Sequence, residues 1–341
     1  MKEVKIGNKV IGKNHPVFII AEIAENHLGN IDLAKAMVDS AKDCGVDAVK
    51  FQHYIVDETM LRDVPKSDNF KEPLYDIITR MKLSIEHHRE VKEYCDSKDI
   101  VYLCTPFGLT AAKEIRDLVP IIKIGSGEFT DLPYLEIVAG WNKPMILSTG
   151  MSTIEEIDMV YKRITEINDN IILLNCTSEY PPIYEDINLN FIKELVDKYD
   201  TIIGHSDHTP DIYTSIAAVV MGAKIIEKHF MLDNNVPGPD NLVSLTPEQL
   251  KSMVDGIRKV EKALINKSKV VYDKELQIRI WARRSIVSIK DIKKDEILTY
   301  DNIWSKRPGT GIPSFRILEV VNKMAKRDIS KDTILDWNDF E

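Results

Sequence analysis

The sequence has no apolar run long enough to cross a membrane and no cysteine pair at metal-binding spacing. A bilayer-spanning helix needs about 20 consecutive apolar residues, and no segment approaches that length. The first residues also lack the apolar core of a signal peptide, so we expect a cytoplasmic protein. None of the four cysteines forms a C-x-x-C pair, which disfavours zinc and redox motifs.

Basic residues are fewer than acidic residues. Lys and Arg number 45 against 54 Asp and Glu, which gives a formal net charge of −9. An acidic chain without a basic block is a poor candidate for general nucleic-acid binding, although it can hold local basic pockets for small anions. We therefore expect neither a nucleic-acid nor a membrane partner. Apolar residues make up 44% and charged residues 29%, the balance of a soluble globular protein.

A repeating pattern of strand and helix fills most of the chain. A hairpin around Gly7-Asn8 is predicted first, and eight short apolar segments follow, each succeeded by a helical pattern. The predicted strands are 18–21, 46–51, 101–104, 121–124, 145–148, 171–176, 201–204 and 224–229. The predicted helices are 32–44, 85–98, 109–118, 133–139, 153–167, 189–198, 212–221 and 247–264.

Eight such units in about 250 residues favour an α/β fold of the (β/α)8 TIM-barrel type. A doubly wound open sheet is the alternative, and the absence of a G-x-G-x-x-G motif after the first strand argues against it. After Leu264 the pattern changes to short strands and frequent turns. We predict a barrel over 1–265, a linker over 266–280 and a small second domain over 281–341, which docks on the barrel or on a partner subunit.

Polar side chains stand at the end of every predicted strand. In a TIM barrel these ends and the loops after them build the active site. The residues in question are Glu22, Lys50, Gln52, Thr105, Lys123, Ser126, Glu128, Ser148, Ser178, Tyr180, Ser206, His208, Glu227 and His229. A single lysine or histidine at a strand end is more often paired structurally than functional, but so many at one barrel mouth favour function.

The residue types indicate what such a mouth binds. Lys50 and Lys123 supply positive charge, and the hydroxyls of Thr105, Ser126, Ser148 and Ser206 supply hydrogen-bond donors. Together they suit a small dianion such as a phosphate ester.

Two histidines and three carboxylates at the same strand ends are candidates for metal binding, acid–base catalysis and sugar binding. His208 and His229 end adjacent strands, which favours a divalent metal completed by water and substrate over a structural pair. Glu22, Glu128 and Glu227 are candidates for acid–base work or for binding a sugar hydroxyl.

The sequence resembles the sialic acid synthase family. The segments that carry the resemblance are FIIAEIAENH (18–27), VKFQ (49–52), KIGSGE (123–128), LSTGM (147–151), CTSEYP (176–181), GHSDHT (204–209), EKHF (227–230), PGPD (237–240) and KRPG (306–309). They follow in order over nearly the whole chain.

The resemblance implies an enzyme that condenses phosphoenolpyruvate with an N-acetylated mannose-type sugar and releases phosphate. It implies a divalent metal on His208 and His229, with Mn²⁺ expected and Mg²⁺ or Co²⁺ as alternatives. Lys50, Lys123, Ser126, Ser206, Thr105 and Ser148 match positions that bind phosphoenolpyruvate, and Glu128 matches the carboxylate that handles the attacking water. Glu22, Gln52, Tyr180 and Asp240 match positions near the sugar. Ser178 stands where one branch of the family has Asn.

The tail resembles the antifreeze-like (SAF, β-clip) domain of the same enzymes. In the family this domain crosses to the partner barrel of a homodimer, which implies a domain-swapped homodimer here. Arg307 matches an arginine that reaches the sugar's N-acetyl group, and Trp281 stands where an aromatic residue lines the same pocket. From the residues alone, Arg307 would be interpreted as a turn residue whose guanidinium donates hydrogen bonds to backbone carbonyl groups.

The resemblance leaves the acceptor sugar open. N-acetylmannosamine, giving N-acetylneuraminate, is the leading candidate. A 2,4-diacetamido-2,4,6-trideoxy hexose, giving a legionaminate- or pseudaminate-type acid, is the alternative, and Asn69 is a candidate sugar contact. Two more distant hypotheses remain. One is a synthase of shorter 2-keto acids, although enzymes of that kind lack the antifreeze-like domain. The other is a sugar-binding barrel without catalysis.

Overall fold

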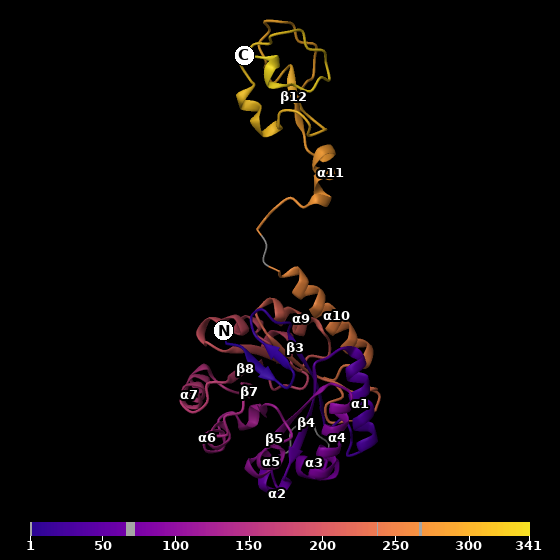
Figure 1. Cartoon of the computed structure of the whole chain (residues 1–341), viewed down its shortest axis with the longest axis vertical. Helices are drawn as coiled ribbons and strands as arrows, with labels where there is room; N and C mark the ends of the chain where they lie inside the picture. Colours follow the sequence, from indigo (N-terminus) through magenta and orange to yellow (C-terminus); the bar gives the residue numbers. More distant parts are fainter. Residues whose placement is uncertain (1, 66–71, 237, 266–267) are drawn as a thin grey trace. The chain divides into compact units, whose positions relative to one another are not determined.

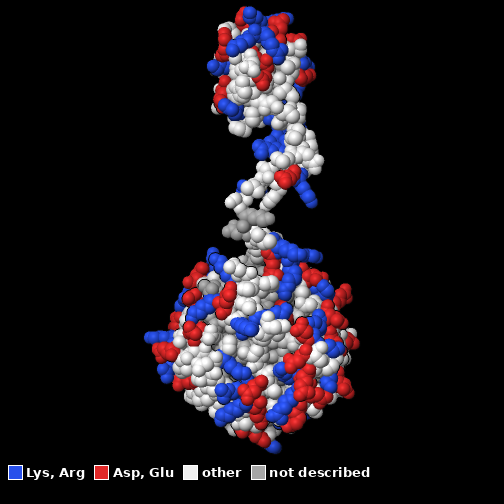
Figure 2. Space-filling model, viewed as in Figure 1, with Lys and Arg blue, Asp and Glu red and all other residues white. Residues whose placement is uncertain are grey.

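The computed structural model describes residues 2–65, 72–236, 238–265 and 268–341. The chain divides into two compact units, Met1–Ile265 and Asn266–Glu341. None of the described helices combines the length and the apolar composition that crossing a membrane requires. On the face drawn in Figure 2, positive and negative side chains are interspersed over the larger unit.

The larger unit is a (β/α)8 barrel, as predicted, with helices arranged around a ring of parallel strands (Figure 1). The hydrogen-bonded order is β5-β4-β3-β10-β9-β8-β7-β6, and the two end strands contact each other. The strands are β3 (Phe18–Ala24), β4 (Ala48–Tyr54), β5 (Val101–Phe107), β6 (Ile122–Ile124), β7 (Met145–Ser148), β8 (Ile171–Cys176), β9 (Ile202–Asp207) and β10 (Ile225–His229).

The outer helices follow the strands in the predicted order. They are α1 (Ile31–Cys44), α4 (Ile85–Ser97), α5 (Leu109–Ile115), α6 (Leu132–Ala139), α7 (Ile154–Thr165), α8 (Leu189–Lys198), α9 (Tyr213–Val220) and α10 (Pro247–Ala263). Local sequence sets their ends. Asn30 caps α1 by accepting hydrogen bonds from Asp32 N and Leu33 N, and Gly45 ends it at φ +85°. Capping boxes at Thr153 and Thr246 start α7 and α10.

Two packed layers hold the barrel together. Inside, apolar side chains from alternate strand positions form one cluster that includes Phe18, Ile146 and Leu174. Between strands and helices lies a larger cluster that includes Phe51 and Phe230. The hairpin β1 (Val4–Ile6) and β2 (Lys9–Ile11) pairs as expected, and its buried Val4, Ile6 and Ile11 belong to the inner cluster.

The structure adds elements that the sequence pattern did not predict. Between β4 and α4 lie two further helices, α2 (Val56–Thr59) and α3 (Leu74–Met81). The segment expected as a linker, 266–280, contains most of helix α11 (Asp273–Ala282). No residue of α11 is buried. Its apolar residues Leu276, Ile278 and Ile280 recur every two positions rather than at helical spacing, so periodicity did not predict the helix.

The smaller unit has its own core. Strands β11 (Ser285–Ser288) and β12 (Ile303–Lys306) pair antiparallel, and short 3₁₀ turns lie at Ser314–Glu319 and Trp337–Asp339. Buried apolar side chains, among them Ile286, Leu298, Ile303 and Leu335, form one cluster. The unit is therefore packed as a small domain.

Candidate active site

A cavity of about 910 Å³ opens at the carboxyl ends of the barrel strands. Each of the eight strands contributes at least one side chain to its lining. They are Glu22 on β3, Lys50, Gln52 and Tyr54 on β4, Thr105 and Phe107 on β5, Lys123 on β6, Ser148 on β7, Cys176 on β8, Ser206 on β9, and Glu227 and His229 on β10. The strand ends thus converge on one site, as the barrel topology requires.

Lys50 lies in a buried ion-pair network. Its Nζ is 2.6 Å from Glu22 Oε2 and 3.5 Å from Glu227 Oε1, and it donates to Thr105 Oγ1 at 3.0 Å. Burial lowers the pKa of Lys50, but the two carboxylates outweigh burial and the net pKa is raised. Lys50 is therefore a fixed positive charge.

Lys123 completes the network from the other side of Glu227. Its Nζ donates to Ser148 Oγ at 2.7 Å and lies 3.6 Å from Glu227 Oε1. Ser206 Oγ donates to the same carboxylate oxygen at 3.1 Å. Burial alone would raise the pKa of Glu227, but Lys123 and Lys50 hold it below its ordinary value. Lys50, Lys123, Glu22 and Glu227 are called the lysine cluster below.

Glu22 is the less strongly stabilised carboxylate of the lysine cluster. Burial raises its pKa to about 7, against the opposing effect of Lys50 and with the support of Glu227. Gln52 Nε2 donates to Glu22 Oε1 at 3.0 Å, and Tyr54 Oη donates to Gln52 Oε1 at 2.8 Å. Tyr54, which the sequence did not single out, therefore orients Gln52.

Gly150 has no side chain, which lets its loop approach the loops of Ser126 and Ser178 closely. Gly150 N donates to Ser126 Oγ at 3.2 Å. A Cβ on Gly150 would lie 2.3 Å from Ser178 Oγ and 2.7 Å from Ser126 Oγ, so only glycine allows this approach. Both serines line the cavity.

Glu128 does not line the cavity directly. Its carboxylate lies against the backbone of Gly125, where an added Cβ would be 2.8 Å from Glu128 Oε2. That oxygen is buried and has no hydrogen-bond partner. Burial raises the pKa of Glu128 to about 7, so its carboxyl group changes protonation state near neutral pH.

His208 and His229 face each other with ring centroids 5.4 Å apart. His208 Nδ1 donates to the Thr177 carbonyl at 2.7 Å, which leaves Nε2 as the acceptor, 3.1 Å from Tyr180 Oη. His229 Nδ1 is buried without a hydrogen-bond partner and lies 3.7 Å from Asp240 Oδ2. Burial, followed by His208, keeps the pKa of His229 well below its ordinary value.

These two imidazoles fit a metal site that leaves several positions to water and substrate. Their unprotonated nitrogens are the form that binds divalent transition metals. Among the described residues no group of three His, Cys, Asp or Glu side chains could hold a metal ion together.

The loops beside the histidines supply an acidic wall, by which we mean Glu25 and Asp240. Both line the cavity, and Glu25 was not predicted as a site residue. Burial raises the pKa of Asp240 to about 6. Apolar side chains of α3 line another part of the cavity, namely Leu74, Ile77, Ile78 and Met81.

The two predicted tail residues are neighbours within the smaller unit. The Arg307 guanidinium lies 5.4 Å from the centroid of the Trp281 ring. Arg307 Nε also donates to the Ala282 carbonyl at 3.1 Å, the kind of contact expected of a turn arginine. Asn69, the other candidate sugar contact, lies outside the described residues.

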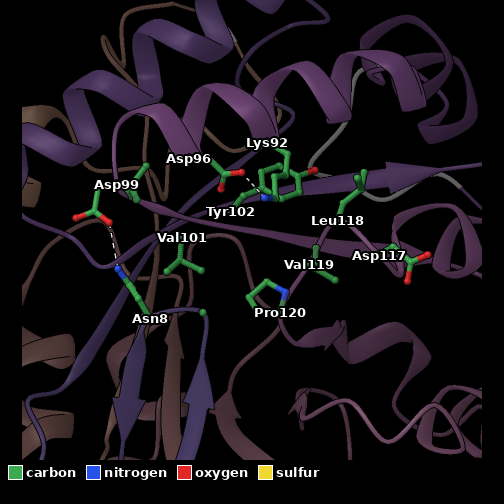
Figure 3. Close-up of a pocket in the computed structure, with 12 residues that line it drawn as sticks. Asn8, Lys92, Asp96, Asp99, Val101, Tyr102, Asp117, Leu118, Val119 and Pro120 are labelled. Atoms are coloured by element: carbon green, nitrogen blue, oxygen red, sulfur yellow. Dashed lines mark hydrogen bonds and ion pairs between the residues drawn. The ribbon is translucent and has the colours of Figure 1, made fainter.

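A second cavity, of about 400 Å³, lies at the amino ends of β5 and β6 (Figure 3). Several of its polar groups are already partnered: Asn8 Nδ2 donates to Asp99 Oδ1 at 3.1 Å, and Lys92 pairs with Asp96. The predicted site residues lie at the opposite end of the barrel.

The chain was compared with known proteins. The NeuB family model matches residues 37–269, and the SAF domain model matches residues 283–341. This chain belongs to the NeuB family. The N,N'-diacetyllegionaminic acid synthase of Legionella pneumophila is 37% identical over 98% of both chains. A pseudaminic acid synthase of Campylobacter jejuni is 35% identical over 99% of this chain and 100% of its own.

A solved structure agrees with these matches. The N-acetylneuraminic acid synthetase of Leptospira borgpetersenii superposes with a TM-score of 0.74 at 32% identity, over 81% of this chain and 95% of its own. The predicted resemblance to sialic acid synthases is thereby confirmed, and so is the SAF domain at the end of the chain.

Proposed function

We propose that this chain is a synthase that condenses phosphoenolpyruvate with an N-acetylated mannose-type sugar to give a nonulosonic acid and phosphate. The observation that carries this proposal is the single cavity in which the lysine cluster and the two facing imidazoles both take part. Membership of the NeuB family supports it, because its named members make acids of this type.

The lysine cluster binds the phosphoenolpyruvate. Lys50 and Lys123 face its negative charges, and hydroxyls of Thr105, Ser126, Ser148 and Ser206 donate to its oxygens. Glu22 and Glu227 hold Lys50 in place and raise its pKa while the cavity is empty. Burial lowers the pKa of Lys123, and Glu227 opposes that effect. A charge-assisted contact of this kind contributes about 1.5–3 kcal/mol.

The reaction forms a C–C bond and a C–O bond to water, and it breaks the C–O bond to phosphate. Carbon 3 of phosphoenolpyruvate attacks the aldehyde carbon of the open-chain sugar, and water adds to carbon 2. The tetrahedral intermediate then collapses with loss of phosphate. Glu128, with its pKa raised to about 7, takes a proton from the water, either after a small movement of the Gly125 loop or through an intervening water molecule.

His208 and His229 would hold a divalent metal, with Mn²⁺ preferred and Mg²⁺ or Co²⁺ as alternatives. A metal bound there supplies Lewis-acid polarisation of the acceptor carbonyl. The Thr177 carbonyl fixes the tautomer of His208 and so presents Nε2 to the metal. Tyr180, stacked on His208 with ring centroids 4.2 Å apart, limits the movement of that imidazole.

N-acetylmannosamine is the leading acceptor, which makes N-acetylneuraminate the product. A 2,4-diacetamido-2,4,6-trideoxy hexose is the second candidate, for two reasons. The relatives from Legionella pneumophila and Campylobacter jejuni, at 37% and 35% identity, have names of that class. The apolar side chains of α3 in the cavity lining also suit the methyl group of a 6-deoxy sugar better than a hydroxymethyl group.

We also propose that the enzyme is a cytoplasmic homodimer in which each SAF domain closes the partner's barrel. Arg307 and Trp281 then contact the acceptor's N-acetyl group. Their mutual contact within the smaller unit presents them together.

The test is phosphate release from phosphoenolpyruvate with each acceptor, in Mn²⁺ and in EDTA. Metal-dependent release with N-acetylmannosamine supports the leading acceptor, and release only with a diacetamido-trideoxy sugar supports the second. No release with any of these sugars, while phosphoenolpyruvate still binds, would contradict the proposed reaction and favour a sugar-binding barrel.

A further inference from the structure

Glu25 is a buried carboxyl group that no described residue satisfies with a hydrogen bond. Its side chain is 2% exposed, yet it lines the cavity. Both carboxyl oxygens are buried without a hydrogen-bond partner. Burying an unpaired polar group is costly, so a partner from within the cavity is expected.

The backbone directs this side chain into the cavity. Strand β3 has a bulge between Glu22 and Ala24, and Ala24 adopts φ +47°. An alanine in this left-handed region costs roughly 1 kcal/mol. The bulge interrupts the alternation of strand side chains, so that Glu22 and Glu25 both line the cavity although they are three positions apart.

The ring of His27 lies near Glu25 but does not reach it as a hydrogen-bond donor. His27 Nδ1 accepts from Gly29 N at 3.1 Å, so the ring proton of neutral His27 is on Nε2. That atom lies 3.7 Å from Glu25 Oε2, beyond hydrogen-bond distance. Burial lowers the pKa of His27 to about 4, so His27 supplies no positive charge.

The surroundings of Glu25 are acidic. Burial, Asp240 and Glu22, in that order, raise its pKa to about 8. The loop carrying Asp240 touches the Glu25 segment, because a Cβ on Gly238 would lie 3.2 Å from Asn26 Oδ1. Asn26 Nδ2 in turn donates to the Phe230 carbonyl and to Ser244 Oγ. The acidic wall is thus held by a tight set of loop contacts.

We propose that Glu25 binds the acceptor sugar, its carboxyl oxygens accepting hydrogen bonds from hydroxyl or amide donors of an uncharged acceptor. This inference rests on the proposed function and deepens it. An uncharged sugar offers many O–H and N–H donors to a carboxylate. A phosphate group on the sugar would instead bring negative charge toward Glu25, Asp240 and Glu22. The site therefore selects a free sugar over a sugar phosphate.

The test compares Glu25→Gln and Glu25→Ala with the wild-type enzyme in steady-state kinetics. At pH 8.5, where the Glu25 carboxyl is largely ionised, we expect the KM for the acceptor to rise roughly 5- to 30-fold in both variants, since a hydrogen bond to a charged group is lost. The KM for phosphoenolpyruvate should stay within about twofold, because Glu25 has no contact with the lysines. Glu90→Gln, at an exposed pair with Lys35, is the matched control.

A second measurement uses N-acetylmannosamine 6-phosphate as an inhibitor. At pH 8.5, above the Glu25 pKa of about 8, the carboxyl is largely ionised, so the wild-type enzyme should bind the sugar phosphate weakly. Glu25→Gln should lower its inhibition constant at that pH by roughly threefold or more because one negative charge is gone. Folded variants with unchanged acceptor KM and unchanged inhibition would overturn the assignment. If the wild-type enzyme turns over no sugar, calorimetric titration of N-acetylmannosamine into wild type and Glu25→Gln still tests Glu25 separately from the reaction.

Discussion

The lysine cluster and the acidic wall share one cavity and differ in how their buried charges are partnered. In the lysine cluster each of the two lysines contacts a carboxylate within 3.6 Å, and hydroxyls of Thr105, Ser148 and Ser206 add hydrogen bonds. In the acidic wall both oxygens of Glu25 lack a hydrogen-bond partner among the described residues, and Asp240 Oδ2 lies 3.7 Å from Nδ1 of His229, whose lowered pKa leaves it uncharged.

This difference separates groups whose charges are balanced within the protein from groups that wait for a ligand. The ion pairs of the lysine cluster hold its charges in place before the substrate arrives, and pre-organised charge is what transition-state stabilisation needs. Among the described residues, Glu22 Oε2 and Glu227 Oε2 have no hydrogen-bond partner, but Lys50 and Lys123 face their carboxylates. An unsatisfied wall gains its partners from the ligand and therefore distinguishes ligands by their donors. We expect substitutions in the lysine cluster to affect phosphoenolpyruvate and those in the acidic wall to affect the sugar.

The largest loss of activity is expected from a substitution of the proposed metal ligand His229. His229→Ala should remove a metal ligand and with it several kcal/mol of transition-state stabilisation, a loss of roughly 10³-fold in kcat. EDTA should reduce wild-type activity to the same level. The measurement is turnover together with Mn²⁺ binding followed by electron paramagnetic resonance.

His205→Gln is the control for the loss of a buried imidazole. His205 lies on β9 and faces the Asn175 carbonyl at 3.2 Å, away from the cavity lining. It should still bind Mn²⁺. Undiminished activity or Mn²⁺ binding in His229→Ala would contradict the metal assignment.

The next effect tests the lysine cluster. Lys123→Ala should reduce kcat/KM for phosphoenolpyruvate by about 30- to 1000-fold, the equivalent of 2–4 kcal/mol. The KM for the sugar should change far less. Lys228→Met is the control, because Lys228 is a fully buried lysine paired with Asp207 at 3.2 Å outside the cavity.

Lys228→Met should lower the thermal stability without a selective effect on phosphoenolpyruvate. If Lys123→Ala raised both substrate KM values equally, the division of the cavity into two functional parts would be wrong.

The same division explains what could be predicted from sequence. The short apolar strands and their polar ends predicted the barrel and the lysine cluster, because a parallel barrel brings strand ends together whatever the loops do. Glu25 was missed because the bulge at Glu22 and Ala24 breaks the alternation on which such predictions rest. Helix α3 was missed because it lies in an insertion between β4 and α4 outside the repeating unit. The positions of contacts such as Gly150 against Ser178 follow from tertiary packing alone.

The smallest effect concerns stability and belongs to the acidic wall. The pKa of Glu25 is raised in the folded protein from 4.5 to about 8. Folding therefore favours the protonated carboxyl, and the stability that goes with it is fully present below pH 4.5 and is lost as the pH rises through about 8. Glu25→Gln mimics the protonated form at every pH. At pH 5, only slightly above the ordinary pKa, the variant should be more stable than the wild type by less than about 1 kcal/mol.

By pH 8.5 we expect the variant to be more stable by about 2 kcal/mol, which is less than the full pKa difference converts to because a folded protein relaxes around a new charge. Urea unfolding of the ligand-free enzyme at both pH values measures this. An equal stability difference at pH 5 and pH 8.5 would contradict a protonated, unpartnered Glu25. Suppose that this result is found together with a raised KM for the acceptor. Glu25 then lowers the stability of the empty enzyme at high pH and is kept for its contact with the sugar. In the lysine cluster, by contrast, the two lysines and two carboxylates balance each other's charges without a ligand.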